Sequence, residues 1–186
     1  MGTLFFYIFI FTAILSIALF IFFYKMDEKY INQLETFSSE HNFNSSIKGK
    51  YQTGDIFRFV SIQNDRHELM YKRQSEMPSK YYSQSQRRYI PASESYQSHW
   101  IILILKNVDQ PARDLILKDL EHEIDQIEWT KLEKKLDGDA ILSTNDNGDI
   151  TIGISIHYYS NATWLKIKTL LTNSVLIADK HLSEFI

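Results

Sequence analysis

The sequence predicts an α+β protein. An N-terminal transmembrane helix is followed by one domain with a mainly antiparallel sheet of about six strands and flanking helices, the last of them C-terminal. Three observations lead to this prediction. The chain begins with a long charge-free stretch, its middle contains short segments in which apolar and polar residues alternate, and its end has apolar residues at helical spacing.

The composition fits an anchor followed by one folded domain. The chain has 186 residues, of which 44% are hydrophobic and 23% charged, as is typical of globular proteins. We divide it into an anchor over residues 1–25 and a domain over residues 26–186. The net charge of −3 argues against a general nucleic-acid-binding protein, which needs a broad basic surface. The absence of Cys excludes disulfides, thiolate metal sites and cysteine nucleophiles.

Residues 4–24 are the predicted anchor, because they carry no charge and are dominated by Phe, Ile, Leu and Ala. A helix of that length spans about 31 Å, close to the hydrocarbon core of a bilayer. A cleavable signal peptide fits less well, since the run is too long and has neither a basic start nor small residues before its end. A helix buried in the fold is the other alternative. Lys25 and Lys29 follow the stretch, so the positive-inside rule predicts a single-pass protein with its domain on the cytoplasmic side.

The first half of the domain is predicted to start as a helix and to continue as an antiparallel meander. Apolar residues at helical spacing extend the first helix over residues 26–40. Three strand-like segments follow, separated by turn signals that contain Gly, Asn or Asp. They cover residues 46–51, 56–63 and 66–73.

Residues 74–98 form the most irregular stretch, rich in Ser, Gln and Tyr, and we interpret it as a long excursion between strands. Basic residues are interleaved with tyrosines here. That mixture is common at protein interfaces, because it offers large contact areas and directed hydrogen bonds. The candidates for partner contact are Tyr81, Tyr82, Arg87, Arg88 and Tyr89. A polar loop without a partner is the alternative.

Two further segments follow this excursion. The continuous apolar run over residues 99–106 indicates a central strand covered on both faces. A second apolar cluster, over residues 114–118, predicts another strand. Leucines four residues apart then predict a short helix over residues 127–136, which Gly138 ends.

The last part of the chain gives clearer signals. An Asn-Gly pair at positions 147–148 predicts a hairpin between strands over residues 140–143 and 149–158. The second of these strands alternates strictly between apolar and small or polar residues. Asn161 is expected to cap the C-terminal helix.

No motif for metal, cofactor or nucleotide binding stands out, and we predict no catalytic residue. The six histidines show neither i,i+4 pairing nor a His-Glu-x-x-His pattern. A calcium loop built around Gly148 would place Ser143 and Ile154 where carboxylates are required. The sequence also lacks a glycine-rich phosphate loop and a Gly-x-Ser-x-Gly elbow.

Acidic residues concentrate between Asp109 and Asp139. Paired carboxylates can catalyse hydrolysis, so one alternative function is a membrane-bound hydrolase that uses Asp114, Asp119 or Asp139. A solvated acidic surface is the simpler interpretation.

These observations together predict a membrane-tethered, non-enzymatic protein-interaction domain. It would be an accessory subunit of a membrane complex or an inhibitor of an effector close to the membrane. Its partners would be the bilayer, through residues 4–24, and a protein of unknown identity. The hydrolase is the first alternative, and binding to anionic lipid headgroups through Arg87 and Arg88 is the second.

Overall fold

The computed structural model describes residues 2–43, 48–51, 58–74, 81–83, 88–90, 98–129, 131–132, 135–136, 138–156 and 160–184. In chain order its elements are α1 (Gly2–Glu40), β1 (Lys48–Tyr51), β2 (Arg58–Gln63), β3 (His67–Gln74), β4 (Tyr81–Ser83), β5 (Arg88–Ile90), β6 (Ser98–Leu105), α2 (Ala112–Asp125), β7 (Lys131–Leu132), β8 (Lys135–Leu136), β9 (Gly138–Thr144), β10 (Ile150–Ile156) and α3 (Asn161–Ser183). The chain divides into two compact units, Met1–Thr36 and Phe37–Ile186.

Helix α1 accounts for the whole first unit and continues to Glu40, as the sequence predicts. Among the residues that the structure describes, no helix combines the length and the apolar character needed to cross a membrane. Large apolar side chains of α1 expose 38–71% of their surface: Phe5, Phe6, Tyr7, Ile8, Phe9, Ile10, Phe11, Ile14, Leu15, Ile17, Leu19, Ile21 and Phe22.

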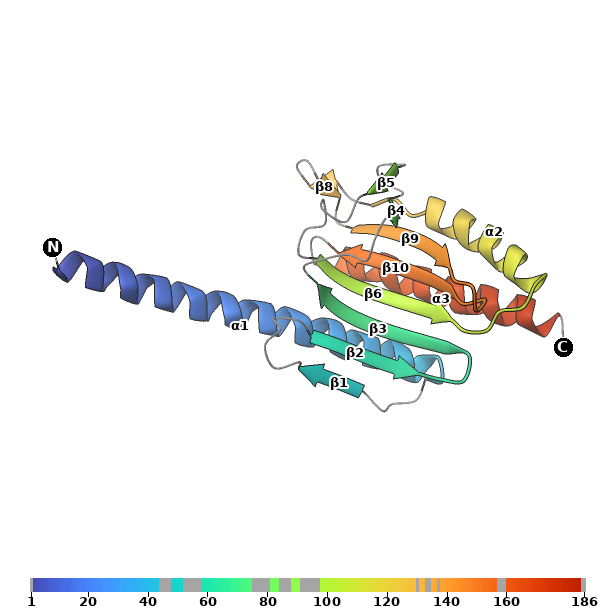
Figure 1. Cartoon of the computed structure of the whole chain (residues 1–186), viewed down its shortest axis with the longest axis horizontal. Coiled ribbons are helices and arrows are strands. Elements are labelled where there is room, and N and C mark those ends of the chain that lie inside the picture. Colours follow the sequence, from blue (N-terminus) through green and yellow to red (C-terminus); the bar gives the residue numbers. More distant parts are fainter. Residues whose placement is uncertain are drawn as a thin grey trace. The chain divides into compact units, whose positions relative to one another are not determined.

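The second unit is built on an antiparallel six-stranded sheet with the order β1-β2-β3-β6-β10-β9 (Figure 1). This confirms the prediction of an α+β fold with a mainly antiparallel sheet and a C-terminal helix. The meander of the first three strands and the hairpin of β9 and β10 are both present, and β6 joins them in the middle.

One face of the sheet is covered by α3, which lies behind the strands in Figure 1 and packs beside α2. His67 of β3 reaches Asp179 of α3, with 3.5 Å between Nε2 and Oδ1, and so identifies the covered face. Strand alternation places the other core residues on the same side. The sheet contributes Ile62, Leu69, Tyr71, Ile101, Leu103, Leu105, Ile150, Ile152, Ile154 and Ile156, all buried.

The opposite face of the sheet is buried at Trp100 but only half-buried further along β6, so the prediction that the central strand is covered on both faces holds for only part of the strand. On β6, Leu103 is fully buried, whereas its neighbours Ile102 and Ile104 are of intermediate exposure. The apolar run therefore reflects one packed face and one apolar but partly open face. A continuous apolar strand does not by itself require two covering layers.

The predicted strand over residues 114–118 is wrong, because this segment belongs to helix α2. Its adjacent apolar residues suggested a strand, but Leu115 exposes 40% of its surface and only Ile116 is fully buried. Burial instead recurs at every fourth residue, close to one helical turn. The buried residues of α2 are Ala112, Ile116, Leu120 and Ile124.

The predicted helix over residues 127–136 is also wrong. Strands β7 and β8 occupy part of it and pair Lys131 with Leu136. Two leucines at helical spacing in a short segment do not outweigh tertiary contacts. One such contact is made by Trp129, whose ring lies so close to Gly138 that a Cβ there would be 2.5 Å from Cζ3.

Helix α3 is predicted correctly except for its first residue. Its N-cap is Ser160, one residue before the predicted Asn161. The Ser160 hydroxyl accepts a hydrogen bond from the backbone N–H of Thr163 at 2.9 Å, which satisfies one of the free donors at the helix start.

The hairpin between β9 and β10 turns through an Asn-Gly pair, as predicted. The side-chain oxygen of Asn145 accepts hydrogen bonds from the backbone N–H groups of Asn147 and Asp149, at 3.0 and 2.9 Å. Gly148 has a φ of +85°, a conformation that suits glycine. Asp149 accepts the N–H of Asn107 at 2.8 Å, and this bond lowers the pKa of Asp149. The turn is thus fastened to the loop before α2.

Replacing Gly148 by alanine is expected to destabilise the fold by about 1–3 kcal/mol, because the backbone would be strained. The new Cβ would also lie 2.8 Å from the carbonyl oxygen of Val108. Urea unfolding of the full chain in detergent measures the loss. Asn147→Ala, at the neighbouring exposed position, is the control and should change stability by less than about 0.5 kcal/mol. Equal effects of the two substitutions would contradict this account of the turn.

Candidate functional site

Four of the five candidate partner-contact residues lie on a separate two-stranded sheet. Tyr81 and Tyr82 belong to β4, Arg88 and Tyr89 belong to β5, and Arg87 lies outside the described residues. The register places Tyr82 directly opposite Tyr89. The sequence suggested an irregular excursion here, so the strand pairing is a new feature.

This pair of strands has a definite place in the second unit. Strand β4 lies beside β9, an edge strand of the six-stranded sheet (Figure 1). The backbone of the candidate contact residues is thereby brought next to that edge. Arg87, the one basic residue that the sequence places between β4 and β5, falls outside the described residues.

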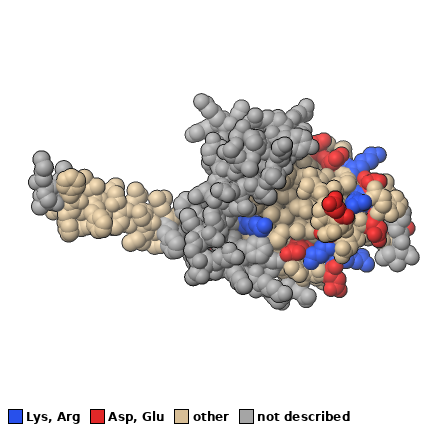
Figure 2. Space-filling view, in the orientation of Figure 1, with Lys and Arg blue, Asp and Glu red and all other residues tan. Residues whose placement is uncertain are grey.

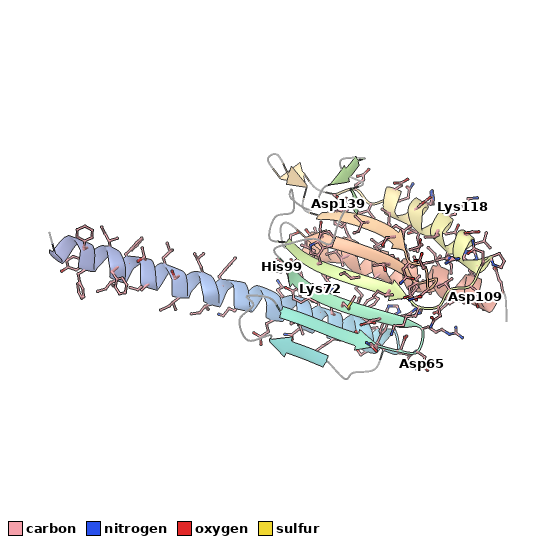
Figure 3. The ribbon with its side chains drawn as sticks, in the orientation of Figure 1. Asp65, Lys72, His99, Asp109, Lys118 and Asp139 are labelled. Atoms are coloured by element: carbon pink, nitrogen blue, oxygen red, sulfur yellow. The ribbon has the colours of Figure 1, made fainter. Side chains whose placement is uncertain are left out.

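The acidic segment does not assemble its carboxylates into one cluster. Asp114 lies in the first turn of α2 and accepts hydrogen bonds from the amide of Gln110, at 2.8 Å to each oxygen. Asp119 lies five residues further along, about 140° around the helix axis. In Figure 3, Asp139 lies at the opposite end of the sheet from Asp109. The residues considered for a hydrolase thus have separate surroundings.

Asp119 joins the two helices of the second unit. His181 of α3 lies 2.8 Å from it through Nε2, and the hydrogen bond lowers the pKa of Asp119. A second link between α2 and α3 runs from the amide of Asn173 to Glu123, at 2.6 Å. Part of the acidic surface therefore serves to fasten α2 to α3.

Asp139 is the buried member of the acidic group, with only 5% of its surface exposed. Its Oδ1 accepts the backbone N–H of Ala140 at 3.0 Å. The strand register places Asp139, Ser155, Trp100 and Lys72 in one row across four strands, on the face opposite α3. Except for Lys72, these side chains are buried. Sequence reasoning missed this row, because its members come from four separate segments.

The half-buried face of the sheet carries apolar residues along its middle. Where described residues are visible in Figure 2, the charged ones lie mainly toward the end with the β2–β3 and β6–α2 connections. Glu68 and Lys106 form an ion pair on this side, with 3.4 Å between oxygen and nitrogen. The half-buried apolar residues are Met70, Ile102, Ile104 and Ile141.

Histidines make several of the long-range polar contacts. Among the residues that the structure describes, no three His, Asp or Glu side chains are arranged to hold a metal ion. Three histidines instead contact a polar side chain that is distant in the sequence, and His181 also lies 3.4 Å from Glu184. These pairs are His67 with Asp179, His99 with the hydroxyl of Tyr71 at 2.7 Å, and His181 with Asp119.

No family model, curated protein or solved structure matches the chain.

Proposed function

We propose that the protein is a single-pass membrane protein whose α+β domain is a non-enzymatic interaction module beside the bilayer. Such a module would be an accessory subunit of a membrane complex or an inhibitor of an effector close to the membrane. The observation that carries the proposal is the apolar surface of α1 between Phe5 and Phe22, whose large side chains expose 38–71% of their area.

The apolar surface of α1 favours a lipid environment. Moving one large apolar side chain out of water is worth about 1.5–3 kcal/mol, and this helix carries more than ten of them. The proposal uses the whole sequence of residues 4–24, including Phe20, Phe23 and Tyr24, whose side chains the structure does not describe. The absence of charge across that stretch is typical of a bilayer-spanning helix.

The few polar side chains in this stretch are compatible with lipid. The hydroxyl of Thr12 donates to the carbonyl of Ile8 at 3.0 Å, and that of Ser16 donates to the carbonyl of Thr12 at 2.8 Å. Hydroxyls satisfied by their own helix need no water. Lys25 and Lys29 follow the stretch, which favours a cytoplasmic domain.

For partner contact we propose the paired strands β4 and β5. They combine three tyrosines and an arginine, residue types that dominate binding energy at interfaces. Tethering to the membrane raises the effective concentration of a membrane-bound partner, so that weak contacts can hold a complex together.

Photo-cross-linking in intact membranes tests this proposal. A photoreactive residue at Tyr82 or Tyr89 of the full chain is expected to give one discrete adduct of fixed stoichiometry. The same residue at Leu115, which is exposed on α2, is the matched control and should give none. Deleting residues 2–24 should abolish the adduct, because the effective concentration is lost. Failure to form an adduct from either tyrosine, or an equal adduct from Leu115, would refute the proposed contact.

A further inference from the structure

His67 occupies an unusual position at the start of β3. Only 3% of its surface is exposed, and its Nε2 lies 3.5 Å from Oδ1 of Asp179 on α3. Its Nδ1 is buried and has no hydrogen-bond partner among the described residues. A neutral imidazole tolerates this arrangement, with a lone pair on Nδ1 and a proton on Nε2. A second proton on Nδ1 would be buried at a nitrogen that has no partner within hydrogen-bond distance among the described residues.

The His67 ring also packs against the segment that ends α1. Asn42 adopts a positive φ of 57°, and the N–H of Phe43 donates to the carbonyl of Ser38 at 2.9 Å, as in a Schellman motif. The ring of Phe43 packs against Phe37 at a centroid distance of 6.3 Å and against His67 at 6.0 Å. His67 therefore contacts both residues 37–43 and the last turns of α3.

We propose that His67 forms an acid-sensitive contact. Its protonation weakens the packing of residues 37–43 and of the C-terminal end of α3 against strand β3. The inference goes beyond the proposed membrane role and does not depend on it. It rests on the burial of one imidazole between two segments that are distant in sequence.

The groups around His67 have opposite effects on its pKa. Burial is the largest effect and lowers the pKa of His67 below its usual value of 6.5. Asp179 and the backbone of Arg66 raise this pKa, and the charge of Arg66 lowers it. Asp179 exposes about half of its side chain, so water screens its attraction. The aromatic cluster also includes His41, whose ring packs at a tilt against Phe37 with a centroid distance of 4.3 Å.

The direction of the pH effect follows from this lowered pKa. The unfolded chain takes up a proton at His67 near pH 6.5, whereas the folded chain does so only at lower pH. The stability contributed by neutral His67 is therefore complete above pH 6.5. It is lost as the pH falls from 6.5 through the lower, folded pKa. Locally opened forms, in which His67 is solvated, gain in population over the same range.

His181 is arranged differently and provides an internal comparison. One of its ring nitrogens lies 2.8 Å from Asp119 and the other 3.4 Å from Glu184. Both ring nitrogens of His181 thus have a carboxylate partner, unlike Nδ1 of His67.

Hydrogen–deuterium exchange of the full chain in detergent tests the proposal between pH 7.5 and 5.5. After correction for the chemical exchange rate, opening of residues 37–43 and 176–184 should rise by about fivefold in acid. One proton allows at most about tenfold per pH unit. Strands β6 and β10 serve as the internal reference. His122→Gln, at an exposed position on α2, should respond like the wild type.

Two variants decide the role of the ring. His67→Phe keeps an aromatic side chain without a titrating group and should show no acid-induced opening. Asp179→Asn removes the carboxylate that favours protonation, so the pKa of His67 in the folded chain should fall further. The factor by which local opening increases from pH 7.5 to pH 5.5 should therefore be larger than in the wild type. Because Asp179 is exposed, this variant remains informative even if His67→Phe does not fold. A wild type without the rise, a His67→Phe variant that keeps it, or an unchanged ratio in Asp179→Asn would overturn the proposal.

Discussion

Replacing Ile14 and Ile17 together by arginine is expected to release the chain from membranes. Both side chains expose 60% of their surface, and both lie near the middle of the charge-free stretch. Each arginine near the centre of a spanning helix costs about 2.5–3.5 kcal/mol, so the pair costs about 5–7 kcal/mol. The membrane-retained fraction after alkaline extraction measures the effect.

The matched control places the same charges on an exposed apolar helix surface of the second unit. Leu165 and Leu176 on α3 expose 64% and 58% of their surface, much like the two isoleucines. Leu165→Arg with Leu176→Arg should leave the membrane-retained fraction unchanged, because these side chains are not in the proposed anchor. If Ile14→Arg with Ile17→Arg remains fully membrane-bound, or if the unaltered chain is found entirely in the soluble fraction, the proposed tether is wrong.

Leu103→Ala is expected to cost about 3–4 kcal/mol of unfolding free energy. Leu103 is fully buried on the face that α3 covers, with Leu69 and Ile152 as its neighbours on the adjacent strands. Removing its side chain leaves a cavity that a sheet held on both sides by neighbouring strands cannot easily close. Urea unfolding of the full chain in detergent, followed by tryptophan fluorescence, measures the change.

Ile104→Ala, one residue further along the same strand, is the comparison for the other face of the sheet. Ile104 is only half-buried, so we expect less than half of the loss seen for Leu103→Ala. The smaller loss at Ile104 would reflect the lower burial of its face of the sheet. Equal losses at the two positions would mean that both faces are packed to the same extent, which would contradict the fold described above.

Elements that depend on local patterns could be predicted from the sequence. The strand over Ile150–Ile156 alternates strictly and follows an Asn-Gly pair. Both signals lie within a few residues of one another in the sequence. Helix α3 has its apolar residues at helical spacing over 23 residues, which is long enough to outweigh other interpretations. Both elements are present, and only the cap moves by one residue, to Ser160.

The errors fall where short apolar segments allow more than one structure. Leu115, Ile116 and Leu117 fit a strand as well as a helix, and the burial of Ile116 on a segment that packs beside α3 favours the helix. Residues 127–136 contain leucines at helical spacing, but the chain there pairs as two short strands. About ten residues of sequence do not decide between helix and strand in these two segments, because the choice depends on the elements against which each segment packs.

The candidate site shows the same division. Tyr82 and Tyr89 could be selected from composition, but their pairing across β4 and β5 is a property of the fold. No sequence signal joins His67 to Asp179, which are separated by most of the domain. By itself the sequence determined the charge-free N-terminal stretch, the α+β class and the best-patterned strands and helices, because hydrophobic periodicity acts locally. The tertiary structure alone decided which polar groups meet and which are buried, because those contacts form only when distant segments pack together.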